Sequence, residues 1–378
     1  MVKRLLACLL GVAIALPLTG CWNYEGLDQL DIVVGIGVDY DKENRLFNVS
    51  YDIADLAGAE KKDGISSKMI HAQGKTLADA AANAKRNEAN RLFFGTAHVL
   101  VLNQQLVREM GILAITETLL REGEYRETMY VVISQEKTAA EILERPEEMS
   151  SIMSVTLLDI ISEDKDVTGT SLDTQLYQVY NVLNSTRKSI LLPVLRRVER
   201  GENIVPDING MAVIRGEMLV GFLSPEQSRY ALFVEDKLDG GVITLSLSDT
   251  PTNDLAMKIF SNKTKKSYTY EENKITVNIK TDTSVCIVEN QNSMDIMDKQ
   301  ITKQIEETAA RMIEANIKSL VSTMQNEFNA DVFGFGEMIY RKDQKLWNQL
   351  SPSWDEIYPT VEVEVSAKVE VMNTAFTK

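Results

Sequence analysis

The sequence predicts an α+β protein with mixed α/β character, built from more than one domain, in which mostly antiparallel sheets carry packed helices. Three observations support this fold class. Apolar strand-like runs occur in close pairs, which favours hairpins, and segments with helical periodicity separate other such runs. One helical segment, near residues 294–329, is much longer than the others. A content of 44% hydrophobic and 25% charged residues in a chain of 378 is typical of a folded globular protein.

The part of the chain from residue 21 to about 200 is predicted to begin with antiparallel strands and to continue with alternating helices and strands. It is expected to form an N-terminal domain of one or two subdomains. Strands are expected at residues 30–40, 45–53, 67–72, 93–102, 128–134 and 189–198. Helices are expected at residues 76–91, 104–121, 138–144 and 171–184, the first capped by Thr76 and the third stopped before Pro146.

A polar stretch at residues 199–203 marks the expected boundary to a C-terminal domain at 205–378. Beyond it, residues 208–214 and 218–223 are predicted to form a hairpin. Ser224, Pro225 and Gln227 supply a capping serine, a proline at the first helical position and a glutamine three residues after the cap, which predicts a helix over 225–236. Further strands are expected at residues 242–248, 256–260, 267–270 and 274–288.

The long helix near 294–329 has an apolar face, and the last strand has one as well. The helix positions recur every three or four residues: Met297, Ile301, Ile305, Ala309, Met312, Ile313, Ile317, Leu320, Met324 and Phe328. We interpret this stripe as core packing, with a groove for a partner as the alternative. In residues 360–372, valines and one alanine alternate with charged or polar residues, which predicts a half-buried strand with one wet face.

The first 20 residues resemble a secretory signal peptide. Lys3 and Arg4 are followed by an apolar run over residues 5–16 and by Leu18-Thr19-Gly20-Cys21, which resembles a lipobox. Removal of residues 1–20 would make Cys21 a lipidated first residue. Two acyl chains contribute about 0.8 kcal/mol for each buried methylene and hold a chain at a membrane surface. A plain signal peptide or an uncleaved anchor is the alternative.

Charge and cysteine content restrict the remaining possibilities. Removal of the leader takes Lys3 and Arg4 with it, so the formal charge falls from −15 to −17. Such an acidic body disfavours binding to nucleic acid. Only Cys286 is then left in the folded body, so an intrachain disulfide is not expected. Because Cys286 stands in an apolar run, we interpret it as a small buried residue.

The sequence contains few residue patterns that indicate catalysis, and no catalytic residue, cofactor or metal is predicted. His71 and His98 stand alone, so a His/Cys zinc site is disfavoured. Common nucleophile-elbow, phosphate-loop and zinc-protease motifs are missing from the sequence. Gly35-Ile36-Gly37 is not interpreted as a dinucleotide fingerprint, because Tyr40 stands where a third glycine is needed.

Two charged clusters are interpreted as solvated loops. Asp39, Asp41 and Glu43 alternate like the start of a calcium loop, but Asn44 stands where glycine is needed, so turn carboxylates are expected. The second cluster is basic, and a contact with anionic lipid headgroups is the alternative there: Lys263, Lys265 and Lys266.

Several blocks of the chain resemble the Ger(x)C lipoproteins, the C subunits of spore germinant receptors. The opening resembles the family in Gly20-Cys21-Trp22 and in the strand that ends Gly35-Ile36-Gly37-Val38-Asp39. The sharpest match is Asp331-Val332-Phe333-Gly334-Phe335-Gly336, followed by Trp347, Trp354 and the terminal strand. The chain departs from the family pattern at Asn23-Tyr24, where charged residues are usual, and at Asn373-Thr374, where a glycine is expected.

The resemblance implies a non-enzymatic subunit, anchored through Cys21 on the outer face of the spore inner membrane. Its implied partners are the polytopic A and B subunits of a nutrient receptor, with which it triggers germination. Four aromatic residues near the C-terminal end are interpreted as core, with a partner interface as the alternative: Phe333, Phe335, Trp347 and Trp354. A substrate-binding lipoprotein of a transporter and an envelope enzyme are the two alternative functions.

Overall fold

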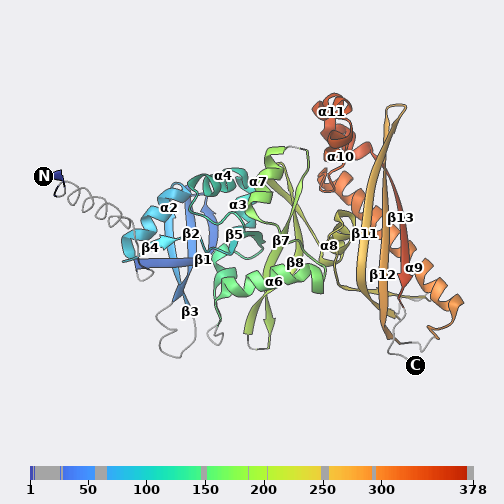
Figure 1. Cartoon of the computed structure of the whole chain (residues 1–378), viewed down its shortest axis with the longest axis horizontal. Helices are drawn as coiled ribbons and strands as arrows, with labels where there is room; N and C mark the ends of the chain where they lie inside the picture. The colour runs from blue at the N-terminus through green and yellow to red at the C-terminus, as the bar shows by residue number, and fades with distance from the viewer. Residues whose placement is uncertain are drawn as a thin grey trace.

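The computed structural model describes residues 1–2, 4, 26, 29–55, 66–145, 151–185, 187–201, 203–247, 255–291 and 295–372 (Figure 1). Nearly all of the expected signal peptide, together with Cys21 and Pro146, lies outside these ranges. Within them the chain forms two sheets with packed helices, and the predicted α+β class with mixed character is confirmed.

The first sheet has nine strands: β1 (Leu30–Asp41), β2 (Leu46–Asp55), β3 (Ser66–Gly74), β4 (Arg91–Phe93), β5 (Val99–Asn103), β6 (Tyr130–Ser134), β7 (Ile190–Arg200), β8 (Asn203–Arg215) and β9 (Met218–Leu223). Their order is β3-β2-β1-β5-β6-β7-β8-β9, with β4 beside β1. The strands at both ends of this order are antiparallel hairpins, whereas β1, β5, β6 and β7 run parallel because helices connect them.

Helices cover both faces of this sheet. One face shares a core with α2 (Leu77–Ala84), α3 (Gln104–Glu109), α4 (Leu113–Glu122) and α7 (Leu176–Ser185). The other face packs against α5 (Ala139–Leu143) and α6 (Met153–Val167). Thr138 begins α5 with a capping box, in which Glu141 returns the hydrogen bond.

The second sheet has the order β10-β11-β12-β13, with bounds β10 (Val242–Leu245), β11 (Leu255–Glu271), β12 (Lys274–Asn290) and β13 (Glu362–Val371). The long helix α9 (Lys299–Thr323) packs its apolar face on this sheet, which confirms the core interpretation of the stripe from Ile301 onward, whereas Met297 lies before the helix and is 62% exposed. The valine face of β13 belongs to the same core, as the alternation predicted. Three short helices complete this part: α10 (Phe335–Lys342), α11 (Gln344–Leu350) and α12 (Trp354–Ile357).

Helix α8 (Pro225–Glu235) lies between the two sheets (Figure 1). The Ser224 side chain accepts a hydrogen bond from the Gln227 N–H at 3.1 Å, so the predicted start is confirmed. Five consecutive residues, 230–234, are buried. Five consecutive positions face every side of a helix. This part of α8 therefore packs in a core that includes Met211 and Val213 of β8 and that also contacts α9 and β11.

Several predicted bounds were wrong for physical reasons. The expected strand 93–102 is two strands, β4 and β5. The expected helix 104–121 is broken into α3 and α4 at Gly111, whose φ of +75° does not fit a helix. The expected strands 256–260 and 267–270 are one strand, β11, and α6 was not predicted. The long helix begins at Lys299 and ends in a π-turn over Met324–Phe328.

The polar stretch at 199–203 connects two paired strands. β7 and β8 form an antiparallel ladder from Ile190↔Ile214 to Arg200↔Asn203, so the chain stays in the first sheet across it. The hairpin β8–β9, expected at the start of a C-terminal domain, therefore extends the first sheet. A division into domains at 200–205 remains a prediction.

Candidate functional site

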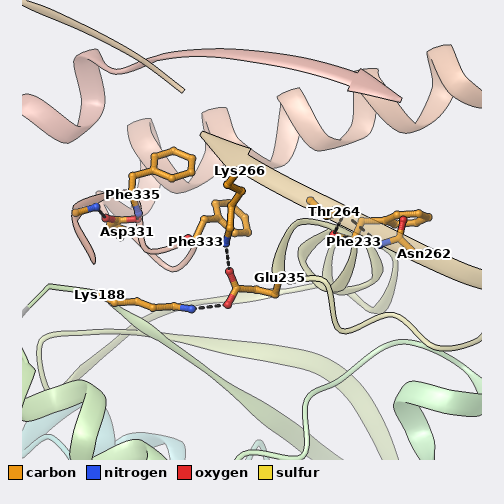
Figure 2. Close-up of polar contacts among 10 residues, drawn as sticks. Lys188, Phe233, Glu235, Asn262, Thr264, Lys266, Asp331, Phe333 and Phe335 are labelled. Carbon is orange, nitrogen blue, oxygen red and sulfur yellow. Dashed lines mark hydrogen bonds and ion pairs between the residues drawn. The ribbon is translucent and has the colours of Figure 1, made fainter. Parts of the chain in front are cut away.

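A buried carboxylate links three distant segments where the two sheets meet. Glu235, at the end of α8, lies between Lys188, just before β7, and Lys266 on β11 (Figure 2). The Lys266 Nζ donates to Glu235 Oε1 at 2.7 Å and to the Phe333 carbonyl at 2.8 Å. The Lys188 Nζ donates to Glu235 Oε2. We call Lys188, Glu235 and Lys266 the junction triad.

The junction triad is a partly desolvated set of charges. The side chains of Lys188, Glu235 and Lys266 are 26%, 14% and 25% exposed. Burial alone raises the pKa of the Glu235 carboxyl, but the two ammonium groups outweigh it and lower the pKa to about 2. Glu235 is therefore ionised near neutral pH, and it is shared by two cations from different sheets.

Asp331 organises the neighbouring Asp-x-Phe-Gly-x-Gly block. Its two carboxylate oxygens accept the N–H groups of Phe335 and Gly336 at 2.9 and 2.8 Å, which begins α10. Gly334 has φ of +68°, a backbone conformation that favours glycine. At Gly336 a Cβ would lie 2.7 Å from a ring carbon of Trp347, so the block needs glycine there too.

The Asp331 block is also tied to the first sheet. The Ser189 N–H donates to the Asp331 carbonyl at 2.9 Å, one residue from Lys188. Burial raises the pKa of the Asp331 carboxyl, against the two backbone hydrogen bonds that it accepts. Figure 2 shows Asp331, Phe333 and Phe335 beside the junction triad.

The four aromatic residues of the resemblance are in the core, as interpreted. Phe333 and Phe335 are 1% and 0% exposed, and Trp347 and Trp354 are 7% and 8% exposed. The two tryptophan rings meet edge to face with centroids 5.2 Å apart. These side chains hold the C-terminal helices on the long helix and the second sheet.

The interpretation of Lys263, Lys265 and Lys266 as a solvated loop was wrong. All three lie in strand β11. Lys263 and Lys265 are exposed, whereas Lys266 is 25% exposed and pairs with Glu235. Lys263 pairs with Asp236 at 2.5 Å, just after α8. The cluster thus fastens α8 to β11, because Glu235 and Asp236 receive charges from the same strand.

Cys286 is half-buried, so its interpretation as a buried residue was wrong. Val285 and Ile287 on either side of it face the core, and alternation along β12 places Cys286 on the other face of the strand. The described helices pack on the face with Val285 and Ile287. An apolar run of five residues does not reveal which face of a sheet is covered.

The glycines and acids of β1 have structural roles. At Gly35 a Cβ would lie 2.0 Å from the Ser154 Oγ, and at Gly37 it would lie 3.2 Å from Leu143, so both glycines let α5 and α6 approach the strand. Asp39 is buried and accepts the N–H of Ala139 at 2.8 Å, so it is not a solvated turn residue as expected. Asp41 caps the turn by accepting the Asn44 N–H at 3.0 Å.

The two histidines have different hydrogen-bond neighbours. The His71 Nδ1 lies 3.0 Å from the Ser50 Oγ, and the His98 Nδ1 lies 3.4 Å from Arg126. Burial and the Arg126 charge lower the pKa of His98. Among the residues that the structure describes, no three His, Cys, Asp or Glu side chains form a group that could hold a metal ion. Over the same ranges, no helix has the length and apolar character needed to cross a membrane.

Sequence reasoning missed the centre of the site. Lys188 and Glu235 were not singled out, because a lysine before a strand and a glutamate at a helix end are common on protein surfaces. The available signal was the all-apolar run over residues 230–234, since a charge that directly follows a buried helix needs a partner. The partner's identity depends on which strand packs there.

The fold and this junction define a class of protein: a two-sheet α+β body in which a partly buried charge cluster connects the two parts. Two family models match the chain in tandem, "Spore germination protein N-terminal domain" over residues 23–197 and "Spore germination B3/ GerAC like, C-terminal" over residues 209–375. The chain belongs to the Ger(x)C family of spore germination proteins.

Individual relatives from Bacillus subtilis (strain 168) match over nearly the whole length. Spore germination protein KC is 20% identical, with 99% of this chain and 97% of that protein covered. Spore germination protein A3 is 23% identical, with 94% of each covered. The crystal structure of the GerBC protein shares the fold, with a TM-score of 0.60, 17% identity, and coverage of 93% of this chain and 100% of that one.

Proposed function

We propose that this chain is the lipid-anchored C subunit of a nutrient germinant receptor and acts without catalysis of its own. The observation that carries the proposal is the tandem match of both family models, in order, along the chain. In this proposal Cys21 is diacylated after removal of residues 1–20. The protein is then held on the extracytoplasmic face of the cell or spore inner membrane, where it assembles with the polytopic A and B subunits.

The lipid anchor gives the subunit a physical role in assembly. Confinement to the membrane plane raises the effective concentration of the body near membrane partners, so weak docking contacts become sufficient. A rigid body suits this role, and the junction triad and the buried residues 230–234 of α8 support rigidity by joining both sheets. A transporter's substrate-binding lipoprotein would need two doubly wound lobes, whereas the second sheet here has antiparallel strands and one parallel edge.

Co-purification from detergent-solubilised spore membranes tests this proposal. A tagged chain with Cys21 intact is compared with Cys21→Ala, and Cys286→Ala serves as the matched control because it removes a thiol from the body. We expect the intact chain and the Cys286→Ala chain to recover two polytopic proteins, and the Cys21→Ala chain to recover little of either. A stable, lipidated chain that recovers no membrane protein would contradict the proposal.

A further inference from the structure

Beside the junction triad lies a cleft of about 690 Å³ that is strongly basic in an otherwise acidic protein. It is bounded by α7, the start of β7, β11 and α10. Its cations are Arg187, Lys188, Lys266, Arg341 and Lys342, and the carboxylate among its lining residues is Glu337. A volume of this size matches small-molecule sites, which are about 300–1,000 Å³.

Each of two carboxylates near the cleft forms ion pairs with two cations. Glu235 is shared by Lys188 and Lys266. Glu337 is shared by Arg187 at 2.7 Å and Arg341 at 2.8 Å. Each carboxylate can neutralise only one of its two cations, so each pair has one positive charge in excess.

Two of the cations are held in place by aromatic rings. The Arg187 guanidinium stands 4.0 Å from the centre of the Tyr340 ring, and the Lys342 Nζ stands 5.6 Å from the centre of the Tyr268 ring. Rings position a cation without neutralising it. Asp331 lies close enough for the charges of Lys188 and Lys266 to act on its carboxyl, and both its oxygens accept backbone N–H groups from Phe335 and Gly336.

The two shared carboxylates come from different elements, Glu235 from the end of α8 and Glu337 from α10, and Glu337 lines the cleft. Figure 2 shows the Lys188 and Lys266 side chains approaching Glu235 from different elements. Partly buried cations that have N–H groups left to donate favour binding of oxyanions. The reason is that a charge-assisted hydrogen bond to a carboxylate or phosphate is stronger than a hydrogen bond between neutral groups. Two such centres favour a ligand with more than one negative group.

We propose that this cleft binds a small polyanion that carries carboxylate or phosphate groups. The site is independent of Cys21 and of assembly with membrane subunits. Binding draws the first sheet, through Arg187 and Lys188, toward β11 and α10 of the second part, since the ligand contacts both. The inference goes beyond the proposed receptor role, because it stands on the contacts around the cleft alone.

Isothermal titration calorimetry of the full chain in mild detergent at low salt tests the site. The probes are citrate, inorganic pyrophosphate and, as a monoanion, acetate. We expect saturable binding of citrate or pyrophosphate with a single site, and no saturation by acetate. Binding of one polyanion alone supports the proposal and identifies the preferred group. Absence of heat with both polyanions, or equal binding of acetate, would overturn it.

Variants separate this cleft from general surface charge. Arg341→Gln with Lys342→Gln is expected to weaken polyanion binding about tenfold, since it removes two charged donors. Lys299→Gln with Lys303→Gln, at the start of α9, removes the same charge elsewhere and should leave affinity within about twofold. Equal weakening by both pairs would show non-specific attraction and sink the proposal.

A second cleft variant leaves every ion pair intact. Asn181 on α7 lines the cleft and is exposed, so Asn181→Asp adds one negative charge there without removing packing. We expect an affinity loss of about threefold to tenfold with an unchanged melting temperature in the absence of ligand. A folded Asn181→Asp protein that binds the polyanion as tightly as the parent chain would place the ligand elsewhere.

Discussion

At the scale of single residues, Glu235 is expected to contribute strongly to stability. The substitution Glu235→Gln leaves two half-buried ammonium groups without their shared carboxylate. We expect a loss of about 2–3 kcal/mol in the free energy of unfolding, at the lower end of what a broken buried pair costs because the groups are partly exposed. Urea unfolding followed by tryptophan fluorescence measures it.

The matched control for Glu235 is Glu307, which is 56% exposed and pairs with Lys303 at 3.6 Å on the surface of α9. Glu307→Gln should change stability by less than about 0.5 kcal/mol. An equal effect of the two substitutions would show that the junction triad does not stabilise the fold.

The same carboxylate predicts a pH dependence. Because the pKa of Glu235 is about 2 in the folded protein, its stabilising contribution is full above its ordinary value near 4.5. That contribution is lost as the pH falls from about 4.5 to about 2. We expect the free energy of unfolding of Glu235→Gln to change less with pH over this window than that of the parent chain. An equal pH dependence of the two proteins would refute the assignment.

The buried carboxyl of Asp39 predicts a pH dependence of stability with the opposite sign. Burial, opposed by the hydrogen bonds from the start of α5, raises the pKa of Asp39 to about 6. Its ionisation therefore costs stability as the pH rises from about 4 to 6. Asp39→Asn retains an acceptor for the Ala139 N–H and should stabilise the protein by about 1–2 kcal/mol at pH 7. Thermal melts at pH 4 and pH 7 test this, and an advantage that does not grow with pH would contradict it.

At the scale of elements, the approach of α6 to β1 depends on Gly35. A Cβ there would lie 2.0 Å from the Oγ and 2.8 Å from the Cβ of Ser154, which is held by Asp52 at 2.6 Å. We expect Gly35→Ala to cost about 2–3 kcal/mol, as overpacking of a close contact does. The urea midpoint measures it.

A compensating change tests the cause of that loss. Ser154→Gly removes both atoms that the new Cβ would meet, so the double variant with Gly35→Ala should be more stable than the sum of the two single losses predicts. Simple additivity would mean that the close approach is not the reason for glycine at 35.

The edge strand β13 is covered by side chains of the long helix. The Glu314 Oε1 accepts the Ala367 N–H at 2.9 Å, and the Glu306 Oε1 accepts the Val371 N–H at 2.9 Å. Unpaired N–H groups on an edge strand attract other strands. We expect Glu306→Ala with Glu314→Ala to promote self-association in sedimentation velocity, whereas Glu307→Ala, one residue from the first site, should remain monodisperse to the same degree as the parent chain.

At the scale of the whole molecule, the two sheets should unfold together. Alternate residues of β8 face different cores, with Met211 and Val213 in the core around α8 and with Ala212 and Ile214 in the core of the first sheet. Cores that share a strand are coupled. We expect one cooperative transition for the full chain, seen alike by fluorescence and circular dichroism.

Truncated chains test the same coupling between the two sheets. A fragment of residues 22–200 loses the β7–β8 ladder, and one of residues 205–378 keeps β8 and β9 without β7 and Lys188. We expect both fragments to be poorly soluble, because each lacks part of the first sheet. A fragment of residues 22–224, in contrast, retains all nine strands of that sheet. Two fragments that fold separately at 200–205 would instead support the domain boundary predicted from the polar stretch.

The sequence by itself determined the elements whose signals are local. Ser224, Pro225 and Gln227 predicted the start of α8, and the apolar stripe predicted α9, although its first turns and its final π-turn differ. Alternation predicted the two faces of β13. Each signal depends on stereochemistry between residues a few positions apart, which is the same in any context.

Only the tertiary structure decided the pairings between distant segments. The polar turn at 199–203 joins two strands that pair with each other, β7 and β8, and no local signal indicated this pairing. Lys266 could face solvent or a carboxylate, and the position of α8 gave it Glu235. Cys286 and its neighbours could have been covered on either face, and α9 covers the face with Val285. These outcomes depend on which surfaces meet, because burial and charge pairing are properties of contacts between segments far apart in the chain.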